Sequence, residues 1–134
     1  MNTTQLLNIL SETDNLDDIL EKIPDLSFSL LLESFCERAH MTKSDLIKKT
    51  NLDRTYAYQI FNNTKNPSQD KVIQLALALS LNLHDTNLLL TLSNNKSLYP
   101  KLKRDAVIIF CINKKYSVME TNELLDEYQY PILQ

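Results

Sequence analysis

Apolar residues recur along most of the chain at the spacing of one helix face. Leu6, Leu7 and Leu10 show this spacing near the start of the chain, and Leu31, Leu32 and Phe35 repeat it further on. The four prolines, at 24, 67, 100 and 131, fall between the periodic segments. The pattern predicts an all-α fold of about seven or eight short helices joined by short loops. The segments expected to be helical are 3–11, 14–22, 27–39, 42–50, 53–63, 69–81, 84–95 and 117–128.

The segment "YPKLKRDAVIIFCINKKY" is ambiguous, because its β-branched centre also fits a buried strand. We expect a helix, since Pro100 suits a first helical turn and Leu102, Ala106 and Phe110 follow at helical spacing.

Several of the expected helices begin with residues that can accept hydrogen bonds from free backbone N–H groups. "TKSD" and "SVME" have the form of a capping box, in which the first and fourth residues bond to each other's backbone. The expected capping residues are Thr42 with Asp45, Ser117 with Glu120, Asp53, and Ser68.

Composition removes several classes of function. The chain has no Gly, so it lacks the glycine loops that hold nucleotide phosphates. Its start has no signal-peptide pattern, and the longest apolar run, "AVIIFCI", is too short to cross a bilayer. We therefore expect a cytoplasmic protein with no membrane partner, no cofactor, and reduced thiols at Cys36 and Cys111.

The net charge of −3 hides an uneven distribution. Residues 1–37 carry a net charge of −7, residues 38–115 of +8, and residues 116–134 of −4. A basic middle can present a positive face even in a chain that is acidic as a whole. A charge bias alone, however, more often reflects ordinary solvated surface.

The basic middle contains a helix with a polar outer face. Placing Ala57 at the centre of the buried side of segment 53–63 puts Thr55 and Gln59 on the opposite side and Arg54 in the exposed first turn. Arg pairs with guanine, Gln with adenine, and Thr reaches phosphate or a thymine methyl group. This helix face is therefore suited to double-stranded DNA.

The order of the elements around this helix resembles a known family. "MTKSDLIKKTNLDRTYAYQIFNNTKNPSQDKVIQLALALSLNLHDTNLLL" is similar to the helix-turn-helix of the Xre/lambda-repressor-like DNA-binding family. The resemblance spans about residues 28–92 and implies a five-helix DNA-binding domain that usually acts as a homodimer on a two-fold operator. The family's base-reading positions fall on Arg54, Thr55 and Gln59, and the first position of its second helix falls on Lys43.

The residues and the resemblance together define a candidate DNA interface. The expected base-facing residues are Arg54, Thr55, Tyr58 and Gln59. The expected phosphate-side residues are Lys43, Lys48, Lys49, Asn62, Lys65 and Asn66.

Three positions depart from the family pattern. Lys43 stands where the family often has Gln, so a phosphate contact is expected there in place of a direct base contact. Asn51 stands where the family commonly has Gly, and we expect it to take the left-handed conformation that the turn needs. Ile47 stands where a small residue is usual, and the small Ala57 on the facing helix offers it room.

We expect three units: an acidic helical segment at 1–26, the helix-turn-helix domain at 27–96, and a helical extension at 97–134 that packs on the domain or on a partner. The main alternative function is a protein–protein adaptor that kept the fold and binds through its acidic ends. An enzyme is not expected, because no catalytic set is visible. Cys36 and His40 share a helix face but are too few for a metal site.

Overall fold

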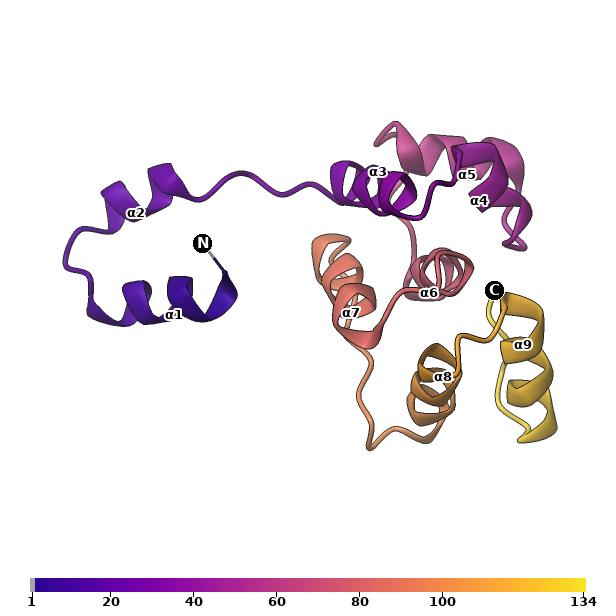
Figure 1. The fold of residues 1–134 in the computed structure, drawn as a ribbon. Helices are drawn as coiled ribbons and strands as arrows, with labels where there is room; N and C mark the ends of the chain where they lie inside the picture. The colour runs from indigo at the N-terminus through magenta and orange to yellow at the C-terminus, as the bar shows by residue number, and fades with distance from the viewer. Residues whose placement is uncertain (1) are drawn as a thin grey trace.

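The computed structural model describes residues 2–134, and these residues form nine helices and no strand, which confirms the all-α prediction (Figure 1). The helices are α1 (Thr3–Glu12), α2 (Leu16–Lys22), α3 (Phe28–Arg38), α4 (Lys43–Lys48), α5 (Arg54–Phe61), α6 (Gln69–Ala78), α7 (Leu83–Leu92), α8 (Lys103–Asn113) and α9 (Val118–Glu127).

The helix α6 lies at the centre of the body formed by α3 to α9. Residues 72–79 are all buried, because α4, α7 and α9 pack around them. The helices α3 to α5 lie on one side of α6, and α8 and α9 lie on the other (Figure 1). The C-terminal extension therefore completes the same core as the helix-turn-helix segment, with Ile108 and Leu125 both inaccessible to solvent.

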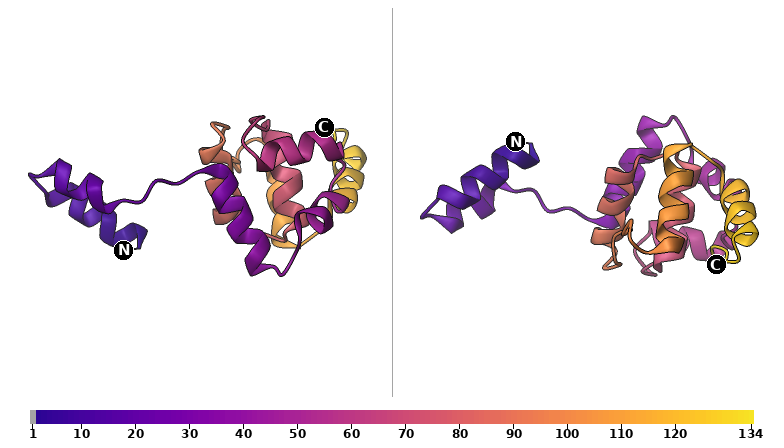
Figure 2. Two further views of the ribbon diagram at one scale, coloured as in Figure 1. Left: turned by 90° about the horizontal axis from the view of Figure 1, so that it is seen from above. Right: turned by 90° about the horizontal axis from the view of Figure 1, so that it is seen from below.

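The helices α1 and α2 form an arm, residues 2–26, that lies apart from the body. Both views in Figure 2 show the arm at the end of an extended segment, with α9 at the opposite end of the molecule. Among residues 2–26, only Ile19 is buried.

The capping predictions hold at three helix starts and need correction at the fourth. Thr42 with Asp45 and Ser117 with Glu120 form complete capping boxes, and the Asp53 side chain accepts the N–H of Tyr56. Ser68 occupies the N-cap of α6, but its side chain accepts no cap hydrogen bond.

The expected start of another helix also needs correction, because α8 begins at Lys103 and not at Pro100. The carboxylate of Asp105 accepts the N–H of Tyr99 at 3.0 Å, so a turn occupies the residues before the helix. The prediction that this segment is a helix and not a strand is confirmed.

Six helices end in a left-handed residue although the chain has no Gly. The residue after the C-cap has positive φ at His40, Asn63, Ser80, Asn94, Lys115 and Gln129. The next N–H then reaches back five residues to a free carbonyl, as from Leu81 to Ala76 at 3.0 Å. Such conformations cost a residue with a side chain more than they cost Gly.

The prediction for Asn51 was wrong, because Asn51 is not among the residues with positive φ. Its backbone N–H instead donates to Oε1 of Gln74 on α6, at 3.0 Å. A side-chain acceptor from α6 therefore stabilises the turn where the family commonly has Gly.

Candidate nucleic-acid interface

The helices α4 and α5 form the pair that the sequence predicts, with one buried side and one exposed side. Leu46 and Ile47 on α4 are buried against Ala57, Ile60 and Phe61 on α5, the last three being 1%, 1% and 4% exposed. Burial of one face fixes the rotation of α5, so its remaining side chains face solvent.

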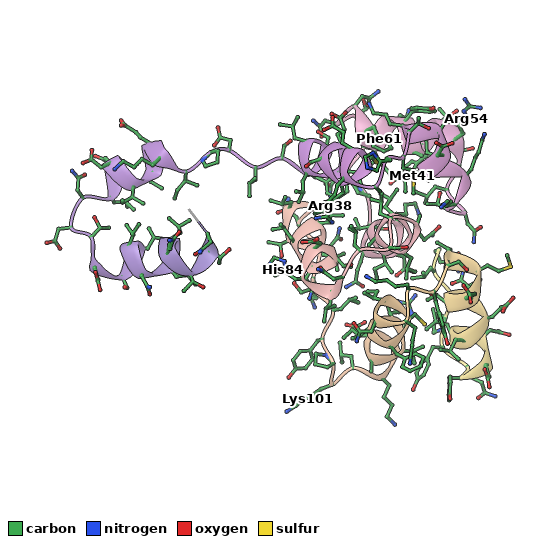
Figure 3. All side chains as sticks on the ribbon, in the orientation of Figure 1. Arg38, Met41, Arg54, Phe61, His84 and Lys101 are labelled. Atoms are coloured by element: carbon green, nitrogen blue, oxygen red, sulfur yellow. The ribbon has the colours of Figure 1, made fainter. Side chains whose placement is uncertain are left out.

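The expected base-facing residues lie on that free face of α5. Arg54 and Thr55 are exposed, and Tyr58 and Gln59 are half-buried. The Arg54 guanidinium carbon lies 5.8 Å from the centre of the Tyr58 ring, a cation–π contact that holds the arginine against its own helix. Figure 3 shows Arg54 at the outer edge of the molecule, clear of both the arm and α9.

Tyr56 and Tyr58 also pack against the edge of the core. The Lys71 ammonium lies 5.5 Å from the Tyr56 ring centre, which links α5 to α6. The two tyrosines thus combine packing with an exposed edge, as amphipathic side chains commonly do.

Lys43 is at the first position of α4 but does not project freely. Its ammonium lies 3.0 Å from the carboxylate of Glu33 and 5.1 Å from the centre of the Phe61 ring. The negative charge of Glu33 offsets the positive charge of Lys43, so a phosphate near Lys43 would be attracted less strongly. Sequence reasoning missed Glu33, which is ten residues away on α3.

Asp45 contributes to the same end of α4. Hydrogen bonding from the Thr42 side chain, and then from the Thr42 backbone, holds the pKa of Asp45 below its usual range, and Lys48 and Lys49 lower it further. The helix start thus carries an ionised carboxylate, which complements the positive end of the helix dipole.

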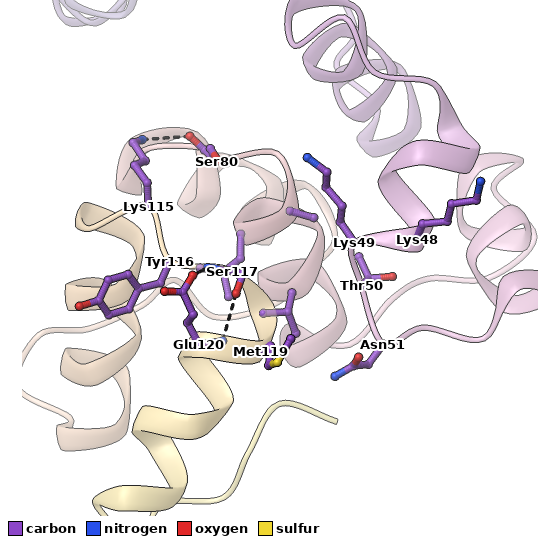
Figure 4. Close-up of a pocket in the computed structure, with 13 residues that line it drawn as sticks. Lys48, Lys49, Thr50, Asn51, Ser80, Lys115, Tyr116, Ser117, Met119 and Glu120 are labelled. Carbon is purple, nitrogen blue, oxygen red and sulfur yellow. Dashed lines mark hydrogen bonds between the residues drawn. The ribbon is translucent and has the colours of Figure 1, made fainter.

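Lys48 and Lys49 are exposed at the end of α4, beside a groove of about 430 Å³. Figure 4 shows this groove between the α4–α5 turn and the start of α9, with Lys115 and Glu120 on the opposite side. The Lys115 ammonium donates to the carbonyl of Ser80 at 2.9 Å, so it is held against the end of α6.

The loop after α5 is held in place by amide side chains. The Asn66 amide nitrogen donates to the carbonyl of Ser93 at 2.9 Å, and that of Asn95 donates to the carbonyl of Pro67 at 2.9 Å. The Asn66 side chain therefore already has a hydrogen-bond partner within the protein, at the C-terminal end of α7. Lys65 remains exposed on this fixed loop.

Asn62 is exposed, and its side-chain oxygen accepts the N–H of Thr64 at 3.1 Å. The N–H groups of Thr64 and Lys65 also donate to the carbonyl of Gln59, at 2.9 and 3.2 Å. These bonds fix the direction in which the chain leaves α5 and hence the position of Lys65.

Gln74 on α6 is a second residue that sequence reasoning missed. Its side chain is fully buried, and its Nε2 donates to the backbone oxygen of Gln134 at 3.0 Å while its Oε1 accepts the Asn51 N–H. A polar residue in the otherwise apolar run of residues 72–79 was the available signal, but its partners lie 23 and 60 residues away in sequence.

The two cysteines lie in the core. Burial raises the pKa of both the Cys36 and the Cys111 thiols, so both are held as neutral thiols. His40 is exposed and occupies the left-handed position after α3. Across residues 2–134, no three His, Cys, Asp or Glu side chains are grouped as metal ligands would be. Within the same residues, every helix is too short or too polar to cross a membrane.

One comparison with known protein families gave a match, over the segment from α3 to the start of α7. Residues 32–85 match the model of a family described as helix-turn-helix, of the Xre/lambda-repressor-like type. The match covers less than half of the chain and includes α4, α5 and α6 completely. No curated protein and no solved structure matches the chain.

Proposed function

We propose that this protein binds specific sequences of double-stranded DNA as a small transcriptional regulator, because residues 32–85 match the model of the Xre/lambda-repressor-like helix-turn-helix family. The helix α5 lies in the major groove in this proposal. Arg54, Thr55, Tyr58 and Gln59 face the bases, and binding involves no covalent step.

The exposed face of α5 is the observation that carries the proposal. Its opposite face is buried in the core, so the helix offers one fixed set of donors and acceptors to a ligand. Arg and Gln side chains recognise guanine and adenine edges in the major groove. No acidic side chain stands on α5 between Arg54 and Phe61 to repel the phosphates.

Phosphate contacts come from the basic residues around this face. Lys48, Lys49 and Lys65 are exposed, and among residues 2–134 none of the three forms an ion pair. Lys43, Asn62 and Asn66 complete the set, although the partners of Lys43 and Asn66 within the protein make their contributions smaller. Each phosphate neutralised releases counterions, so affinity falls as salt is added.

An eight-residue recognition helix spans few base pairs. We therefore propose that the functional unit is a homodimer that places two copies of α5 on two half-sites of an operator.

Selection of preferred sites from random duplex DNA tests the proposal. The intact protein is expected to enrich a short motif, and Arg54→Ala combined with Gln59→Ala is expected to lose the preference while remaining folded. Enrichment of the same motif by both proteins would contradict the assignment of α5.

A second candidate function is protein–protein adaptation. Exposed apolar side chains on the arm and on α8, including Phe110 at 46% exposure, favour a protein partner for these regions. An adaptor would show little affinity for duplex DNA at any salt concentration, which separates it from the regulator.

A further inference from the structure

Exposed large hydrophobic side chains occur in two groups and nowhere between them. From residue 31 to residue 98, all within the described structure, no large hydrophobic side chain is exposed. One group lies at residues 7–30, mostly on the arm, and the other at residues 99–132, in the C-terminal extension. Within residues 27–96, only Leu30 near the start of α3, with 65% exposure, belongs to either group.

The arm cannot bury its own apolar residues. Leu7, Leu10, Leu16 and Leu20 are 62%, 41%, 55% and 54% exposed, and Ile19 is the one buried residue among residues 2–26. Isolated helices as short as α1 and α2, with 10 and 7 residues, are marginal in water. The arm therefore needs a surface that covers its leucines.

The second group includes an apolar groove between α8 and α9. It has a volume of about 430 Å³ and is lined by Ala106, Val107, Phe110, Tyr116, Leu124 and Tyr128. The rings of Phe110 and Tyr116 meet edge to face, with centres 6.0 Å apart, so this wall of the groove is preformed. Phe110 and Tyr128 remain 46% and 60% exposed.

Charge on the α8 wall of the groove complements the arm, whereas the α9 wall carries the acids Glu120, Glu123, Asp126 and Glu127. Residues 2–26 carry six acids and one base, whereas residues 101–115 carry five bases and one acid. Lys103 and Lys114 lie at the two ends of α8, and Lys114 lies 5.6 Å from the ring centre of Phe110. Throughout the described residues, neither these two lysines nor any arm acid forms an ion pair.

The groove lies away from the base-facing residues of α5. Figure 3 shows Lys101, just before α8, on the opposite side of the molecule from Arg54. The basic residues beside the groove are thus free to meet an acidic segment while α5 stays uncovered.

The position of the arm favours a groove on a second molecule. The arm and α9 lie at opposite ends of the body in Figures 1 and 2. Residues 23–27, which connect α2 to α3, span at most about 17 Å even when fully extended. A second copy can bring its groove to the arm without any change within either body.

We infer that the arm of one copy docks its leucine face into the α8–α9 groove of a second copy, and that the reciprocal contact closes a two-fold dimer. Both contacts use the same pair of surfaces, as two-fold symmetry requires. The interface leaves both copies of α5 exposed. The inference concerns self-association and does not depend on DNA binding.

Sedimentation of the full chain over about 1–100 µM tests this inference, because this concentration range detects a dimer with a micromolar dissociation constant. The wild type is expected to form dimers. Leu10→Asp with Leu20→Asp in the arm, and Phe110→Asp in the groove, should each raise the dimer dissociation constant at least about tenfold, since each places a charge in an apolar contact. Met119→Asp is the matched control, because Met119 is 68% exposed on α9 outside the groove, and it should remain dimeric.

A second test of the interface reverses charges and leaves every apolar residue in place. Lys103→Glu with Lys114→Glu changes two exposed side chains and should also weaken the dimer. Mixing that protein with Asp17→Lys, Asp18→Lys protein should restore association, because each interface then has opposite charges again.

Three results would overturn the inference. They are a monomeric wild type across the whole range, dimers that persist in the arm or groove variants, and loss of the dimer in Met119→Asp. Circular dichroism confirms that each variant keeps its helices, so that loss of association is not loss of folding.

Discussion

The backbone N–H of Asn51 donates to Oε1 of Gln74 across 3.0 Å, which joins the turn before α5 to the central helix of the core. The other end of the same amide donates to the backbone oxygen of Gln134. One fully buried side chain therefore connects the helix-turn-helix to the C-terminal end of the described chain.

Gln74→Leu is expected to lower the free energy of unfolding by about 1–3 kcal/mol, because it leaves the Asn51 N–H without its acceptor. Gln69→Leu is the matched control, since Gln69 is on the same helix and its hydrogen bond to Lys96 is exposed. Urea unfolding measures both variants. Equal losses of stability in the two would contradict the role given to Gln74.

Replacing a left-handed residue with Gly is predicted to raise the stability of the protein. Ser80 is exposed and has φ of 53°, so Ser80→Gly should raise the free energy of unfolding by about 0.5–1 kcal/mol. Asn51→Gly should bring no gain, because Asn51 lacks positive φ and glycine only adds freedom to the unfolded chain. Thermal or urea unfolding of the two variants distinguishes these cases. A gain at Asn51 that matches the gain at Ser80 would contradict the assigned conformations.

Arg104 is expected to stabilise the contact between α8 and α6. Its guanidinium forms two hydrogen bonds of 3.1 Å with Asp70 and one of 2.9 Å with the carbonyl of Pro131. Arg104→Ala should lower the free energy of unfolding by about 1–3 kcal/mol. Arg104→Lys should recover less than half, since an ammonium cannot form the paired contact. Lys103→Ala, next to it and exposed, should change stability by less than about 0.5 kcal/mol.

Asp45 predicts a pH dependence. Its pKa in the folded protein lies below the ordinary value of 3.8, so its stabilising effect is complete above that value and is lost as the pH falls through the folded pKa. The difference in unfolding free energy between wild type and Asp45→Asn should therefore be largest near neutral pH and shrink in acid. Urea unfolding at a series of pH values measures it. A difference that stays constant from neutral to strongly acidic pH would contradict the assignment.

Local rules predicted much of the fold, because they depend on neighbours in sequence. The boxes at Thr42 and Ser117 each need only a partner three residues away, and both form. The buried face of α5 follows from the spacing of Ala57, Ile60 and Phe61.

Contacts between distant residues account for what the sequence did not reveal. Lys43 faces Glu33 from another helix, and Asn66 faces Ser93 across 27 residues. The family pattern suggested a left-handed Asn51, but a side chain from α6 supplies the acceptor that this turn needs. Pairings of this kind depend on the tertiary arrangement and leave no local pattern.

Replacing Lys65 with Ala is predicted to weaken DNA binding equally for all sequences. Its side chain is exposed on the fixed loop after α5, where it is expected to meet phosphate and not bases. Lys65→Ala should therefore weaken binding to all duplexes by a similar factor and reduce the salt dependence by about one counterion. Fluorescence anisotropy with a preferred and an unrelated duplex measures both effects. A change confined to the preferred duplex would instead assign Lys65 to base recognition.

The most direct test of the DNA-binding proposal is the affinity of wild type and of Arg54→Ala, Gln59→Ala protein for a selected and a scrambled duplex, between about 50 and 200 mM salt. The proposal predicts that wild type prefers the selected duplex, that its affinity falls steeply with salt, and that the double variant keeps the salt dependence but binds both duplexes alike. Little binding by wild type at any salt, or an unchanged preference in the double variant, would contradict it.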